Sequence, residues 1–210
     1  MRATPIVRLI TYVNVLVFLA WFACVYFPGG PEFMLRNFLV SWDSLTDGRW
    51  WTLLTSAFSH NMILHIAINM FVLRGFGTIM SLEMGQKTFF IFYLLAATSG
   101  SFVHSLVSAF WMHQPDLPAL GASGAIAGII LYFSLLFPDE KILLLGFIPL
   151  RAMWGAVILV GFDVWGLLEQ TRGGGTLIGH GAHLGGAAVG ICWFLVTTAT
   201  KKSQNPEISE

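Results

Sequence analysis

Apolar residues along this 210-residue chain gather in six stretches, each edged by charged residues, glycine or proline. A membrane-spanning helix needs about 20 mainly apolar residues, and the stretches come near that length. The pattern predicts an all-α membrane protein with six transmembrane helices in a single domain, residues 1–200, and a polar cytoplasmic tail, residues 201–210. The spans are expected near 9–27, 62–82, 87–109, 121–137, 152–169 and 180–199.

Composition supports this interpretation. Only 10% of the residues are charged, whereas a soluble domain carries about 25%. The formal net charge is zero, so the charge balance gives no indication of a nucleic-acid partner, and the expected surroundings are membrane lipids. The first apolar stretch lacks a clear small-residue cleavage site, so we expect a retained helix and no removed signal peptide.

The distribution of basic residues predicts the orientation. Cytoplasmic loops are enriched in Lys and Arg, and a cytoplasmic N-terminus places more basic residues inside than outside. The inner set is Arg2, Arg8, Arg74, Lys87, Lys141, Arg151, Lys201 and Lys202, and the outer set is Arg36, Arg49 and Arg172. We expect both termini in the cytoplasm, most simply at a bacterial inner membrane, with an organelle as the alternative. The tryptophan-containing loop 28–60 is expected at the membrane interface.

A serine in a glycine frame, Gly121-Ala122-Ser123-Gly124, stands at the start of the fourth span. Amides in a first helical turn lack acceptors within the helix, and the helix dipole is positive there. A hydroxyl attacking a carbonyl at this point would therefore have donors for the resulting oxyanion. Taken alone, the motif favours helix packing, since Gly124 and Gly128 form a GxxxG pair.

A histidine motif, Ala182-His183-Leu184-Gly185-Gly186, opens the sixth span. Its small residues allow close approach to the fourth span, which would bring Ser123 and His183 together as nucleophile and base. Two alternatives to His183 as the base remain. The His183 imidazole could have a structural role, hydrogen-bonded to a neighbouring carbonyl, or His180, one turn earlier, could be the base.

The second span carries His65 and Asn69 on one helix face, near its outer end. Leaving either side chain unsatisfied in lipid would cost several kcal/mol, so the pair should face the bundle interior. There it could complete an oxyanion site with the Ser123 amide, or it could form a structural hydrogen bond between helices.

The chain resembles the rhomboid family of intramembrane serine proteases in the order of its motifs. Ser59-His60-Asn61 precedes His65 and Asn69, and the serine motif and the histidine motif follow. The likeness extends from about residue 8 to residue 198. The turn Pro138-Asp139-Glu140-Lys141 and the two motifs most resemble the presenilin-associated, mitochondrial-type branch. That branch has an additional N-terminal span, which we do not expect in this chain.

The resemblance implies a rhomboid-type bundle with an interfacial first loop. It also implies Ser123 as nucleophile, His183 as general base and acid, and His65 and Asn69 with the Ser123 amide as oxyanion stabilisers. No acid is placed obviously to orient His183, which agrees with a dyad. We expect Asp163, in the fifth span, to have a structural role, bonded to a histidine such as His104 or to backbone.

The expected function is that of a serine endopeptidase that cleaves transmembrane protein substrates near the outer face through an acyl-enzyme. A catalytically silent binder or escort of membrane proteins is the second hypothesis, and a transporter or channel is the third. We expect no cofactor and no metal site, because no histidine is followed by glutamate as a His-Glu-x-x-His protease requires.

Overall fold

The computed structural model describes residues 2–144, 147–174 and 178–204 and is mostly helical. Within these ranges, five helical segments are long and apolar enough to cross a membrane, and one shorter apolar helix, α8, joins them. The prediction of a six-helix membrane bundle is confirmed. The long segments are α1 with η1 (Pro5–Tyr26), α5 to α6 (Ile63–Glu83), α7 (Gln86–Phe110), α9 (Ala152–Thr171) and α10 (His180–Gln204).

The second segment is interrupted in its middle. It consists of α5 (Ile63–Val72), a π-helical turn η3 (Leu73–Gly77) and α6 (Thr78–Glu83). The β-strands were not expected from the sequence. β1 (Lys141–Leu144) and β2 (Ile148–Arg151) form an antiparallel hairpin between α8 and α9. The last helix extends the sixth span into the expected tail as far as Gln204, and residues 205–210 of that tail lie outside the described residues.

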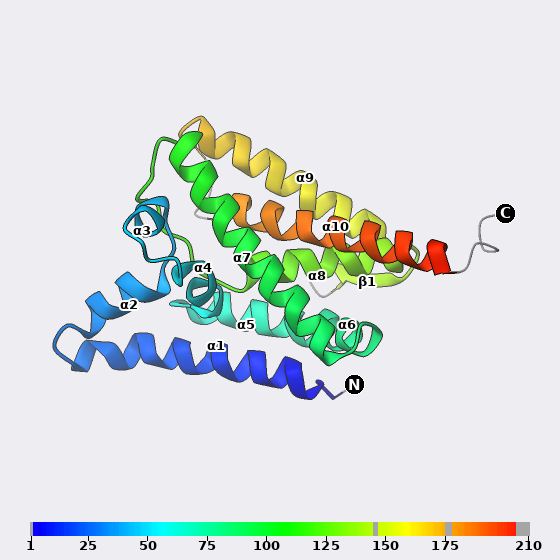
Figure 1. Cartoon of the computed structure of the whole chain (residues 1–210), viewed down its shortest axis with the longest axis horizontal. Coiled ribbons are helices and arrows are strands. Elements are labelled where there is room, and N and C mark those ends of the chain that lie inside the picture. The colour runs from blue at the N-terminus through cyan, green and yellow to red at the C-terminus, as the bar shows by residue number, and fades with distance from the viewer. Residues whose placement is uncertain (1, 145–146, 175–177, 205–210) are drawn as a thin grey trace.

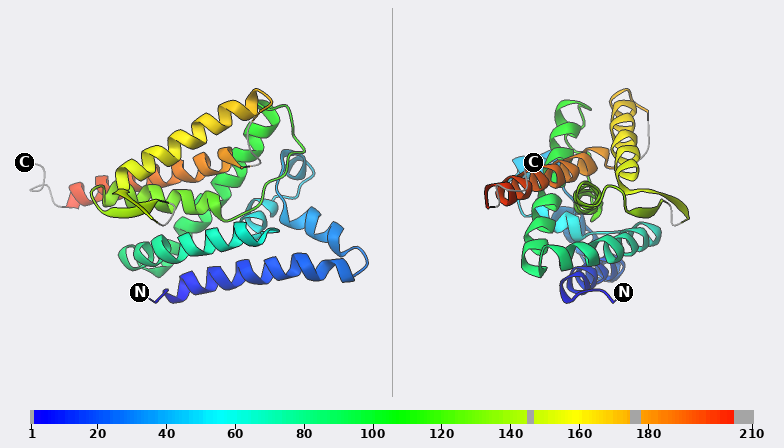
Figure 2. Two further views of the ribbon diagram at one scale, coloured as in Figure 1. Left: turned by 180° about the vertical axis from the view of Figure 1, so that it is seen from behind. Right: turned by 90° about the vertical axis from the view of Figure 1, so that its right-hand side faces the viewer.

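The short helix α8 (Ser123–Leu136) lies near the middle of the bundle, as the end-on view in Figure 2 shows. Ten of its 14 residues are buried. Its 14 residues correspond to about 21 Å, less than the roughly 30 Å of a hydrocarbon core. α8 alone is therefore too short to cross the hydrocarbon core.

Glycines bring α10 and α8 into backbone contact. A Cβ atom at Gly128 would lie 2.7 Å from the carbonyl oxygen of Gly186, and one at Gly190 would lie 2.6 Å from that of Gly128. A side chain at Gly100 of α7 would similarly come within 2.7 Å of the Ala182 oxygen. This is the close approach that small residues permit between membrane helices.

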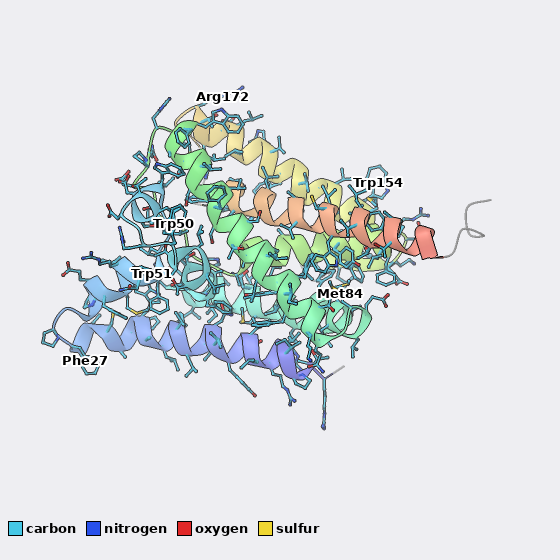
Figure 3. All side chains as sticks on the ribbon, viewed as in Figure 1. Phe27, Trp50, Trp51, Met84, Trp154 and Arg172 are labelled. Carbon is cyan, nitrogen blue, oxygen red and sulfur yellow. The ribbon has the colours of Figure 1, made fainter. Side chains whose placement is uncertain are left out.

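The long loop after α1 folds into short helices at one end of the bundle (Figure 1): α2 (Gly30–Phe38), α3 (Trp42–Thr46), α4 (Thr52–Thr55) and η2 (Ser56–Phe58). Trp50, Trp51 and Phe27 lie at this end in Figure 3, and Met84 and Trp154 lie toward the other. The N-terminal end of α1 and the C-terminal end of α10 share that other end. The chain is thus a multi-pass membrane protein with an even number of crossings.

Candidate active site

Ser123 is the first residue of α8, and the loop before it is held against the first loop. Ala119 exchanges two backbone hydrogen bonds with Val40, and the Gly121 amide donates to the Ser56 carbonyl at 2.9 Å. Gly121 has φ +125°, a value that a residue with a side chain rarely adopts. The cap residue Ala122 makes no side-chain hydrogen bond to the first turn, so the first-turn amides remain open to a ligand.

The hydroxyl of Ser123 meets the imidazole of His183. Ser123 Oγ lies 2.9 Å from His183 Nε2, and the His183 side chain is 20% exposed. The contact depends on the packing of α8 on α10, because a Cβ atom at Gly124 would lie only 3.0 Å from the Ala182 carbonyl oxygen. The two residues chosen from the sequence as nucleophile and base are therefore within hydrogen-bonding distance.

An acid does lie beside His183, contrary to the expectation from the sequence. Asp163 Oδ1 is 2.9 Å from His183 Nδ1 and 2.7 Å from His180 Nδ1. The expected partner His104 instead has its Nε2 3.3 Å from the Leu117 carbonyl. Asp163 is thus bonded to histidines, as expected, but to His180 and His183 and not to His104, because the sequence could not show which way α9 is rotated. The available signal was an acid within the fifth span, followed at the start of the sixth span by two histidines three residues apart.

His180 does not take the position of the base. Its side chain is 1% exposed, its ring centre is 6.4 Å from that of His183, and its Nδ1 faces Asp163. The imidazole that reaches Ser123 is that of His183.

His65 lies next to the serine. A Cβ atom at Gly121 would lie 2.9 Å from His65 Nε2 and 3.8 Å from Ser123 Oγ, so both groups border the same backbone position. Asn69, by contrast, is already engaged. Its Nδ2 is 3.0 Å from His60 Nε2 and donates to the His65 carbonyl at 3.1 Å. Because an amide nitrogen carries two hydrogens, both donors of Asn69 are in use.

His60 is a buried member of this site to which sequence reasoning gave no role, although it stood in the motif. Its Nε2 faces Asn69 Nδ2 and, at 3.5 Å, the Ala122 amide. Since both neighbours are donors, Nε2 accepts and the ring is neutral with its hydrogen on Nδ1. Burial, with a smaller contribution from His65, lowers the pKa of His60 to about 3.

The cluster of Asp163, His180 and His183 is also the place where a metal ion could bind. Its three ligand atoms lie within 4.8 Å of one another, and imidazole and carboxylate are both metal ligands. The two nitrogen–oxygen distances, 2.7 and 2.9 Å, are those of direct hydrogen bonds. These hydrogen bonds account for the geometry without an ion.

Taken together, the site has a hydroxyl bound to an imidazole, a carboxylate bound to the other ring nitrogen, and open first-turn amides beside the hydroxyl. Such an arrangement can activate the hydroxyl for attack on a carbonyl and can stabilise the oxyanion that forms.

Comparison with known proteins gives matches over most of the chain. A family model described as the Rhomboid domain matches residues 47–200. RHOMBOID-like protein 12, mitochondrial, of Arabidopsis thaliana is 38% identical over 175 residues, 77% of this chain and 51% of that protein. Rhomboid protein 1, mitochondrial, of Saccharomyces cerevisiae is 32% identical over 198 residues, 91% and 54% of the two chains.

Presenilin-associated rhomboid-like protein, mitochondrial, of Homo sapiens is 31% identical over 185 residues, covering 87% of this chain and 45% of that protein. The chain thus spans about half the length of the curated relatives that it matches.

Proposed function

Because the chain belongs to the rhomboid family, we propose that it is an intramembrane serine endopeptidase that cleaves transmembrane segments of membrane proteins. The observation that carries the proposal is the 2.9 Å contact between Ser123 Oγ and His183 Nε2. A polar pair of this kind in a membrane protein is expensive to bury and is a functional candidate for that reason.

In the proposed reaction Ser123 is the nucleophile. His183 Nε2 takes the hydroxyl proton as Oγ attacks the scissile carbonyl, and the same nitrogen then gives the proton to the leaving amine. The resulting acyl-enzyme is hydrolysed when His183 activates a water molecule in the same way. General acid–base catalysis of this kind contributes about 10²–10⁴-fold to the rate.

The oxyanion would be held by the Ser123 amide and the His65 ring, which lies against Gly121 beside the serine hydroxyl. A donor in such a site is worth about 10²–10³ in kcat. Asn69 takes part only after an exchange of partners, because its two amide hydrogens are directed at His60 and at the His65 carbonyl. We therefore place Asn69 in the oxyanion site as a donor that becomes available when substrate binds.

The short length of α8 supports cleavage within the membrane, near its outer face. If the end of α8 at Leu136 reaches the inner surface, Ser123 lies about 9 Å below the outer one, given a helix of about 21 Å in a core of about 30 Å. A substrate helix protects its carbonyl groups with hydrogen bonds, so the segment to be cut must unwind locally before Ser123 can attack.

The experiment is a comparison of wild-type protein with Ser123→Ala, using a purified membrane protein substrate in liposomes and a fluorophosphonate probe. We expect both cleavage and labelling to be abolished in the variant, while its unfolding midpoint and its substrate binding stay unchanged. Wild-type protein that binds the substrate but neither cuts it nor reacts with the probe would instead establish the alternative function, a catalytically silent binder or escort.

We further propose that both termini lie in the cytoplasm. The ends of α1 and α10 lie together, away from Trp50 and Trp51, and eight of the eleven basic residues belong to that inner side. A bacterial inner membrane is the expected location. The relatives' names favour a mitochondrial membrane as the alternative. Tags at the two termini should both be protected from protease in intact cells and accessible after permeabilisation.

A further inference from the structure

We propose that Asp163 is a positioning residue for the base, so that the site operates as a Ser123–His183–Asp163 triad with His180 as a second hydrogen-bond partner of the carboxylate. The inference rests on the proposed function, because it assigns Asp163 a role in the protonation of the proposed base. Asp163 lies on α9, and His180 and His183 lie on α10.

Two ring nitrogens converge on one carboxylate oxygen. Asp163 Oδ1 lies 2.9 Å from His183 Nδ1 and 2.7 Å from His180 Nδ1, and the Asp163 side chain is 2% exposed. An ionised carboxylate only accepts hydrogen bonds, so each Nδ1 atom must carry a hydrogen. Burial of a carboxylate is tolerated when it is paired in this manner.

The hydrogen on Nδ1 decides the chemistry at the other side of the His183 ring. In the neutral imidazole one nitrogen donates and the other accepts, so Nε2 presents its lone pair to Ser123 Oγ at 2.9 Å. This is the tautomer that a general base requires. Without an acceptor at Nδ1, the ring would be free to rotate or to place its hydrogen on Nε2.

Proton balance is maintained without any transfer to Asp163. The proton leaves Ser123 Oγ for His183 Nε2, and the imidazolium that forms lies beside the carboxylate. The proton then passes from Nε2 to the nitrogen of the leaving amine, which restores neutral His183. The Nδ1 hydrogen stays on the ring throughout, and the negative carboxylate stabilises the transient positive charge in a poorly solvated site.

His180 fixes the carboxylate from the second side and joins α9 to α10. A Cβ atom at Gly166 would overlap the His180 ring, coming within 2.7 Å of Cδ2. The absence of a side chain at position 166 therefore makes room for the imidazole. Phe162 packs edge-on against the same ring, with centroids 5.4 Å apart. Loss of His180 should loosen Asp163 but leave its direct bond to His183.

The test compares Asp163→Ala, Asp163→Asn and His180→Phe with wild-type protein, with Asp116→Ala at an exposed loop acid as the matched control. We expect Asp163→Ala and Asp163→Asn each to lower kcat by at least about 100-fold with KM within about 3-fold, since the Asp→Asn change in a serine triad lowers kcat by about 10⁴-fold. Asp163→Asn keeps the shape of the side chain but loses its charge, and its amide NH2 can donate to Nδ1 and so favour the wrong tautomer. His180→Phe should lose less than Asp163→Ala, and the control should match wild type.

A second readout is the tautomer of His183, measured by NMR on protein labelled with ¹⁵N-histidine. We expect hydrogen on Nδ1 in wild-type protein and a mixture of tautomers in Asp163→Ala. Unfolding midpoints are measured for all variants. If Asp163→Ala does not fold, Asp163→Asn decides: a kcat at least about 10-fold below wild type supports the role, as expected for loss of charge next to an imidazolium.

Failure of this inference can be told apart from failure of the proposed function. If wild-type protein cleaves substrate and folded Asp163→Ala retains kcat within about 3-fold, Asp163 is structural and the protease assignment stands. If Asp163→Ala raises KM but leaves kcat unchanged, the same conclusion follows: Asp163 is structural. If wild-type protein neither cleaves nor reacts with the probe, the protease assignment falls, and the tautomer measurement alone judges Asp163. An unchanged tautomer in Asp163→Ala then overturns the positioning role.

Discussion

Replacing Gly186 with alanine should separate the nucleophile from its base without altering either. The new Cβ atom would overlap the carbonyl oxygen of Gly124 and lie 2.6 Å from its carbonyl carbon, both of which are backbone atoms. To reach an ordinary contact of 3.4 Å with that carbon, the two helices must separate by at least about 0.8 Å, and clearing the nearer oxygen requires more. Gly124 directly follows Ser123, and Gly186 lies one turn after His183.

The same displacement lengthens the catalytic contact. The distance between Ser123 Oγ and His183 Nε2 would grow from 2.9 Å to about 3.7 Å or more, beyond the range in which a base takes a proton efficiently. A misplacement of about 1 Å lowers rates by about 100-fold, equivalent to about 2.7 kcal/mol. Overpacking should also lower the free energy of unfolding by about 1–3 kcal/mol.

The assay combines cleavage of a model transmembrane substrate with the rate of fluorophosphonate labelling at Ser123, and an unfolding titration is run in parallel. Gly161→Ala is the matched control, because an added Cβ atom there meets nothing within 4 Å. We expect normal labelling in the control and about 100-fold slower labelling in Gly186→Ala. Labelling of folded Gly186→Ala within about 3-fold of wild type would refute the claim that backbone contact between α8 and α10 sets the distance between nucleophile and base.

Two further predictions concern the other side of the site. Gly121→Ala should slow both labelling and cleavage by about 10²-fold. Gly121 has a φ of +125°, and an added Cβ atom would lie 2.7 Å from His65 Cε1, so the substitution would force His65 away from the oxyanion site. A variant that reacts as fast as wild type would contradict this placement of His65. His60 is neutral in the folded protein because its pKa is lowered to about 3, whereas an unfolded histidine titrates near 6.5. Folding free energy from this group is therefore fully present above pH 6.5 and should fall by about 1.4 kcal/mol per pH unit below it, until about pH 3. Unfolding titrations from pH 7 to pH 4 test this, and a His60→Gln protein with the same pH slope as wild type would argue against it.

Much of the fold follows from local features of the sequence. Hydropathy over about 20 residues located the six spans, because each membrane helix must satisfy its own backbone and present apolar side chains to lipid. Glycine spacing identified the tight contact between α8 and α10, and the order of serine and histidine motifs pointed to Ser123 and His183. These signals are carried by residues close together in the chain, so they can be read without knowing how the helices are arranged.

The acid beside His183 was decided only by the tertiary structure. Asp163 and His183 belong to different helices, and whether they meet depends on the rotation of α9 about its axis, which side-chain packing such as His180 over Gly166 determines. The partners of Asn69 are similar: the sequence showed an amide that needed hydrogen bonds, and only the fold assigned them to His60 and His65. Sequence thus predicted which polar groups lie within the apolar spans, because transfer into lipid acts on each residue separately. Contact between those groups arises from the packing of whole helices, which no single segment encodes.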